Sequence, residues 1–164
     1  GTITIEGTVY LNDMISGQVI DNAFTGVIVQ SQAKLTIDDA KTSQPEVTIS
    51  QAFPWQIIVG MTNAGGSDIA IDSTQINSFI NFAGDTSFAV TAPSGFHGSN
   101  NFILEAGETD SLFFRVDTTG ILSGNRQINV KVSAIEINSQ RSILKEKTAT
   151  IKVELPANIR IMKT

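Results

Sequence analysis

The sequence predicts an all-β protein, an immunoglobulin-like antiparallel β-sandwich with an extra β-hairpin at its N-terminus. Apolar and polar residues alternate with a period of two in many short runs, a pattern that only a strand shows to a single core face. Turn-forming residues separate these runs at intervals of roughly 8–12 residues, which is typical of sandwiches and not of βαβ units. No segment repeats its apolar residues with the period of a helix.

Composition and charge narrow the class of protein. The chain has 164 residues, of which 41% are hydrophobic and 16% charged, and its net charge is −5. That length suits one ordinary domain, and the hydrophobic content argues against disorder. The dispersed basic residues argue against nucleic acid as a partner, and no apolar run approaches the roughly 18 residues that membrane insertion needs. Because cysteine is absent, disulfides, thiol nucleophiles and cysteine-bound metals are excluded.

Two stretches predict the centre of the sandwich. Alternate residues of the run 55–61 are apolar, and Ile58 is apolar on the other face, which indicates a central strand with Trp55 in the core. In the stretch 101–117, Gly107 can take the positive φ of a tight turn between the two arms of a hairpin. Further elements are expected as strands around 47–49, 69–71, 88–90, 128–134 and 149–155, a helical turn within 75–80 and a bulge near Ala134.

The first 42 residues form a separate segment in this interpretation. An alternating run from Ile3 to Leu11 is followed by turn residues, and a second, interrupted apolar run extends over 27–37. Residues 38–45 are polar and lack apolar periodicity, so they predict a linker. We therefore divide the chain into a β-hairpin segment, 1–42, and an immunoglobulin-like module, 43–164.

This hairpin segment also resembles the end of the chain. Residues 27–37 align with 151–161 at an offset of 124, and residues 3–5 align with 128–130 at an offset of 125. The match predicts that the segment is the last strands of a preceding copy in a tandem array. The alternative is one larger sandwich whose first and last hairpins are alike. An unpaired apolar face would need to dock on the module or form a homodimer through the hairpin.

Several short motifs resemble a family of bacterial modules. The stretch 55–66 (WQIIVGMTNAGG) resembles the V-x-N-x-G strand and turn of bacterial immunoglobulin-like modules. The stretch 104–116 resembles their L-x-P-G-E…F-x-V hairpin, with Ala106 in place of the usual Pro, and Gly124 with 128–132 resembles the strand that follows. Together they resemble the cell-adhesion-related domain found in bacteria (CARDB) and its alpha-galactosidase-associated relatives. The resemblance implies an extracellular, non-catalytic module, and it supplies no catalytic residues.

Candidate catalytic and metal-binding residues are few. His97 is the only histidine, so any Ser-His-Asp arrangement must use it, and no Gly-x-Ser-x-Gly motif is present. One histidine without cysteine does not furnish a zinc site. Calcium needs only oxygen ligands, but the acidic residues lack the spacing of a known calcium loop, so solvated carboxylates are the expectation. We expect no catalytic, cofactor-binding or metal-binding residues; the acidic groups weighed for calcium are Asp38, Asp39 and Glu46, and Asp68, Asp72 and Asp85.

The remaining candidates are aromatic residues that could contact a ligand. Phe96 and His97, in the long loop 91–101, are the predicted ligand-contact residues, with Phe79 and Phe82 as further aromatic candidates. The sequence therefore favours a non-catalytic structural or adhesive module of a larger bacterial surface or secreted protein, whose partners are other modules, a surface protein or a glycan. The alternative is a carbohydrate-binding module that accompanies a secreted glycan-active enzyme.

Overall fold

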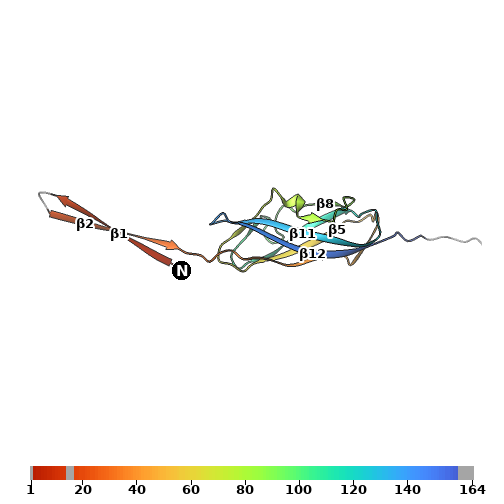
Figure 1. The fold of residues 1–164 in the computed structure, drawn as a ribbon, viewed down its shortest axis with the longest axis horizontal. Helices are drawn as coiled ribbons and strands as arrows, with labels where there is room; N and C mark the ends of the chain where they lie inside the picture. The colour runs from red at the N-terminus through yellow and green to blue at the C-terminus, as the bar shows by residue number, and fades with distance from the viewer. Residues whose placement is uncertain (1, 14–16, 159–164) are drawn as a thin grey trace, which may run out of the picture. The chain divides into compact units, whose positions relative to one another are not determined.

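The computed structural model describes residues 2–13 and 17–158, which form two compact units that divide between Ser31 and Gln32. The first unit is a two-stranded hairpin and the second is a β-sandwich (Figure 1). Within the described ranges, the helical structure is confined to the 3₁₀ turn η1 (Ile76–Ser78). The predicted all-β class, with an N-terminal hairpin and one helical turn, is confirmed.

The hairpin consists of β1 (Thr2–Asp13) and β2 (Gly17–Ile28). The two strands pair antiparallel in one uninterrupted ladder, from Thr2 opposite Ile28 to Asp13 opposite Gly17. The returning strand β2 is therefore as long as β1.

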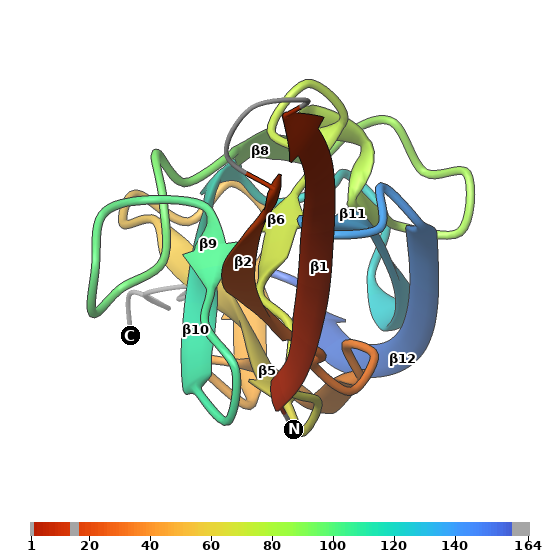
Figure 2. The same cartoon turned by 90° about the vertical axis from the view of Figure 1, so that its left-hand side faces the viewer.

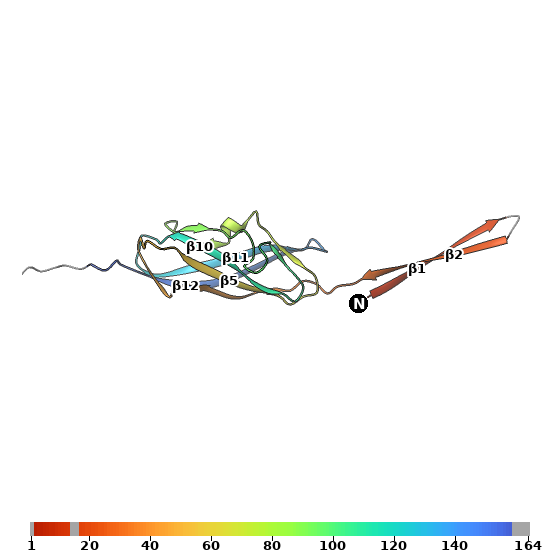
Figure 3. The ribbon, with the colours of Figure 1, turned by 180° about the vertical axis from the view of Figure 1, so that it is seen from behind.

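Two sheets make up the sandwich. The first has the order β3 (Leu35–Thr42), β5 (Trp55–Asn63), β10 (Thr109–Thr118) and β8 (Ala89–Thr91). The second has the order β4 (Glu46–Thr48), β12 (Ser142–Glu154), β11 (Gly124–Glu136), β6 (Ile69–Ile71) and β9 (Ile103–Leu104), and β7 (Ile80–Asn81) also pairs with β11. Figure 2 shows β10 and β12 on opposite sides of the sandwich, and Figure 3 shows β5 and β12 running along its length.

The core lies between these sheets and is built from alternate residues of the long strands. Trp55 is 2% exposed, and its ring meets that of Phe82 edge-on, with 6.2 Å between centroids. The indole Nε1 of Trp55 donates a hydrogen bond of 3.1 Å to Thr119 Oγ1, which satisfies its one polar atom. The predicted core position of Trp55 and central position of its strand are both confirmed.

The sandwich begins earlier than the sequence indicated. Residues expected to be a linker form most of β3, which pairs with β5, so the units divide after Ser31 and not after Thr42. A register shift between Ile37 and Asp39 breaks the alternation of the strand, which is why a period-two pattern failed to reveal it.

Two local expectations were wrong. The predicted hairpin over 101–117 is a crossing between sheets, because β9 pairs with β6 while β10 pairs with β5. The turn itself is as expected, with Gly107 at φ 80°. The pairing of β11 with β12 continues without a shift past Ala134, so no bulge lies there. The last three residues of the matched stretch 151–161 lie outside the described residues.

Candidate functional site

A buried carboxylate fixes the start of the sandwich. Glu136, at the end of β11, is 2% exposed and accepts a hydrogen bond of 2.7 Å from the backbone N–H of Ala33. Arg141 donates from Nε to Glu136 Oε2 at 3.0 Å and from Nη2 to the carbonyl oxygen of Ala33 at 2.9 Å. Both backbone groups of Ala33 are thereby bound by one ion pair, which pins the chain just after the hairpin unit.

The same segment is held from its other side by the turn that follows β5. The buried Asn63 side chain accepts hydrogen bonds from the backbone N–H groups of Lys34 at 3.2 Å and Gly65 at 3.1 Å. A Cβ at Gly65 would lie 2.3 Å from the carbonyl oxygen of Gln32 and 2.5 Å from the Cα of Ala33. Only glycine lets the two backbones approach this closely.

Hydrogen bonding keeps Glu136 charged. The hydroxyl of Ser139, the N–H of Ala33 and the guanidinium of Arg141 lower the pKa of Glu136 from its ordinary value of 4.5 to about 2, although burial opposes the shift. Sequence reasoning missed this residue, but a signal was present. Glu136 has the same parity along β11 as the buried residues Val132 and Ala134, so a carboxylate there had to be buried and paired.

The last strand, β12, carries the chain away from the anchor over thirteen residues, roughly 40 Å of extended backbone. It begins beside Arg141, passes Lys147, whose Nζ donates to the carbonyl oxygens of Ile37 at 3.2 Å and Asp38 at 2.6 Å, and ends in parallel pairing with β4. Because these contacts advance along β3, β4 and β12 together, the first and last strands of the sandwich are parallel. The chain therefore enters at one end and leaves at the other.

The structure places the two predicted ligand-contact residues in different environments, one buried and one exposed. Phe96 is 1% exposed and belongs to the core, so it is not a surface platform, and Phe79 and Phe82 are buried as well. His97 is exposed and lies on the half-buried ring of Phe113, with ring centroids 4.6 Å apart and planes tilted by 34°. No hydrogen bond joins the His97 ring to a serine or a carboxylate within residues 26–158.

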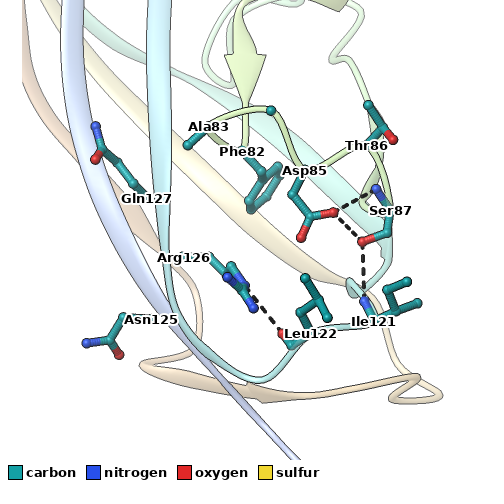
Figure 4. Close-up of a pocket in the computed structure, with 11 residues that line it drawn as sticks. Phe82, Ala83, Asp85, Thr86, Ser87, Ile121, Leu122, Asn125, Arg126 and Gln127 are labelled. Atoms are coloured by element: carbon teal, nitrogen blue, oxygen red, sulfur yellow. Dashed lines mark hydrogen bonds between the residues drawn. The ribbon is translucent and has the colours of Figure 1, made fainter.

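A surface cleft of about 620 Å³ lies between the loop after β7 and the start of β11 (Figure 4). Its polar groups mainly form hydrogen bonds within the turns to which they belong. Asp85 accepts hydrogen bonds from the backbone and hydroxyl of Ser87, and Arg126 donates to the carbonyl oxygens of Leu122 at 3.3 Å and Ser123 at 2.8 Å. The Ser87 hydrogen bonds, with a smaller effect of the Arg126 charge, lower the pKa of Asp85.

The acidic residues weighed for calcium are dispersed. Asp38 accepts from Thr62 Oγ1 at 2.6 Å, Asp39 pairs with Lys41 at 2.7 Å and Glu46 pairs with Lys152 at 2.8 Å. In the other group, Asp68, Asp72 and Asp85 accept hydrogen bonds from the backbone N–H groups of Ala106, Thr74 and Ser87 respectively. In the described part of the chain, no three metal-ligating side chains come together. A membrane-crossing helix is not found there either.

Comparisons with known proteins identify no family. No family model matches the chain, and no curated protein matches it. Among solved structures, the chain is similar to AggA, the major subunit of aggregative adherence fimbriae type I from Escherichia coli, with 13% sequence identity and a TM-score of 0.39. The match covers 79% of this chain and 98% of AggA. A TM-score of this size does not support a transfer of function from AggA.

Proposed function

We propose that the chain is a non-catalytic structural and adhesive module of a larger bacterial surface or secreted protein, in which it acts as a spacer between other modules. The observation that carries the proposal is the path of the backbone through the sandwich. The chain is pinned at Ala33, leaves after Glu154 at the opposite end, and has parallel first and last strands. The motifs that resemble CARDB modules support the same role and an extracellular location.

The load path follows from this arrangement. Tension between Ala33 and Glu154 pulls β3 and β4 along the sandwich in one direction and β12 in the other. The hydrogen bonds between β4 and β12 lie across the strands, so such a force loads them together and not one after another. The contacts of Lys147 with the β3 backbone add to the same connection. A module of this kind keeps its length under tension.

Single-molecule pulling on the full chain, held by its two ends, tests the spacer role. We expect one main unfolding event of the sandwich, at a force that falls when Lys147→Met removes the contacts with Ile37 and Asp38. Lys145→Met is the matched control, because Lys145 is exposed on the same strand. Equal forces for Lys147→Met and the unchanged chain would contradict the proposed load path.

A second candidate function is glycan binding, which the exposed pair His97 and Phe113 favours. The pair lies on the outer face of the β3–β5–β10–β8 sheet, where Phe113 is opposite the half-buried Ile58. Apolar ring faces beside polar groups such as Arg115 suit the faces and hydroxyls of a sugar. Here the chain would serve as a carbohydrate-binding module of a secreted glycan-active enzyme.

A glycan array with the full chain distinguishes the two roles. The binding-module proposal expects a glycan signal that Phe113→Ala abolishes and that Phe53→Ala, at an exposed residue outside this sheet, leaves unchanged. No signal from the unchanged chain, or a signal insensitive to Phe113→Ala, would count against this surface.

A further inference from the structure

The two hairpins of the chain, β1–β2 and β11–β12, have matching ladders. Each consists of twelve consecutive antiparallel pairs. An offset of 124 residues matches Val27 of β2 with Ile151 of β12. Because Val27 pairs with Ile3 and Ile151 pairs with Arg126, the register then fixes the offset of β1 at 123 (126 − 3), and not at the 125 that sequence alone indicated.

The difference of one residue between the two offsets falls in the turns. Three residues separate Asp13 from Gly17, which are paired, and four separate Glu136 from Arg141, whose backbone groups are joined by a hydrogen bond of 2.9 Å. The offsets of 123 and 124 therefore match the two hairpins strand for strand, and Asp13 falls at the position of the buried carboxylate Glu136.

The inward face of β11–β12 is reproduced in the first hairpin. Every buried apolar residue of β11 and β12 has an apolar residue or glycine at the matching position of the first hairpin. Position 21, where strict alternation would place an apolar residue, is Asp, and it matches the exposed Lys145. The seven matched pairs are Ile128 and Ile5, Val130 and Gly7, Val132 and Val9, Ala134 and Leu11, Ile143 and Val19, Ile151 and Val27, and Val153 and Val29.

The matched positions differ in burial where the structure describes both side chains. Ile151 and Val153 are each 1% exposed, because the sheet containing β5 and β10 packs on them. Their counterparts Val27 and Val29 are 44% and 47% exposed. Because Val27 and Val29 are exposed where Ile151 and Val153 are covered, the apolar pattern of the first hairpin calls for the same covering sheet.

We propose that the N-terminal hairpin is the closing hairpin of a preceding sandwich of the same design, and that its apolar face binds a second copy of the β3–β5–β10–β8 sheet. The inference rests on the proposed function, in which the chain is one of several consecutive modules. It specifies where one module ends and the next begins. Val29 belongs to the preceding module and Ala33 is already anchored in the next, so only residues 30–32 join the two. The hairpin is thus a core element of its own sandwich and not a linker.

A chain extended by a second copy of residues 32–123, placed directly before Gly1, tests the inference. We expect the added copy to fold onto the hairpin, so that its half-life in trypsin rises about tenfold or more above that of an unfolded segment. Ile5→Asp with Val9→Asp, on the apolar face, should remove this protection. Thr4→Asp with Thr8→Asp, on the other face of the same strand, is the matched control and should retain it.

A variant of the hairpin tests whether protection fails only because the side-chain volumes of the hairpin do not match those of the added sheet. Gly7→Val with Leu11→Ala installs the residues of β11 at the matched positions. Protection with either the native or this matched hairpin supports the proposal, and lack of protection with both overturns it. A homodimer of the unextended chain that Ile5→Asp with Val9→Asp dissociates would also overturn it, since a second hairpin would then cover the face. None of these outcomes depends on the pulling experiment, whose readout is the unfolding force of the sandwich that begins at Gln32.

Discussion

The carboxylate of Glu136 accepts a hydrogen bond of 2.7 Å from the backbone N–H of Ala33, across 103 residues of sequence. This bond joins the end of β11 to the first residues of the sandwich, and Arg141 completes it by binding the carbonyl oxygen of the same residue. The hydrogen-bonded carboxylate of Glu136 thus takes the place of the backbone strand pairing that a longer β3 would provide at this end of the sandwich.

The first prediction concerns the pH dependence of stability. The pKa of Glu136 is lowered to about 2 in the folded chain from an ordinary 4.5, so its contribution to stability is complete above about pH 4.5 and is lost as the pH falls toward 2. Melting temperatures measured between pH 2 and 6 should therefore fall more steeply for the unchanged chain than for Glu136→Gln. Parallel curves for the two proteins would contradict this role of the carboxylate.

The second prediction tests the close approach at Gly65. In Gly65→Ala the new Cβ would meet the backbone of Gln32 and Ala33 at 2.3–2.5 Å, so that segment must move. We expect a loss of about 1–3 kcal/mol in the free energy of unfolding, measured by urea titration. Gly7→Ala, where a Cβ meets nothing within 4 Å, is the control and should change little. Similar midpoints for both variants would refute the account of this crossing.

The third prediction concerns the hydrogen bond between Trp55 and Thr119. Thr119→Val leaves the buried indole N–H without its acceptor, at a cost of about 1–3 kcal/mol. In a double-mutant cycle with Trp55→Phe, we expect a coupling energy of about 0.5–1.5 kcal/mol, since the second substitution removes the orphaned donor. Circular dichroism follows unfolding in all four proteins, and additive effects would show that the bond contributes nothing.

The fourth prediction separates the two aromatic residues around the long loop. Phe96 is fully buried, so Phe96→Ala should cost about 3–5 kcal/mol of unfolding free energy. Phe113 is only half-buried beneath His97, so Phe113→Ala should cost less than half as much. Urea unfolding of both variants measures the contrast, and equal losses would place Phe113 in the core as well.

The sequence predicted the burial and central position of β5 because alternate residues from Trp55 to Met61 are apolar and Ile58 is apolar on the other face. β3 escaped prediction, since its register shift disrupts that period and its outward residues Asp39 and Lys41 look like a linker. The crossing at Gly107 resembles a hairpin in sequence, because a tight turn looks the same whether its two arms share a sheet or not.

The candidate sites were less predictable for a related reason. The side chains of a loop do not alternate between two faces as those of a strand do. Nothing in the sequence therefore showed that Phe96 lies in the core while His97 lies outside it. Asn63 and Gly65 were recognised as parts of a strand-and-turn motif, but their role in holding Lys34 and Gln32 needed the tertiary contact. The boundary between the units likewise depends on long-range pairing and not on local composition.

The direction of mechanical resistance tests the central claim most directly. Cysteine handles at Gln32 and Leu155 load the sandwich along its length, so the pairing of β4 with β12 is sheared. Handles at Gln32 and Ala106, which both lie at the end where the chain enters, open the strands one hydrogen bond at a time. The account predicts a clearly higher unfolding force for the first pair. Equal forces, or a higher force for the second pair, would contradict it.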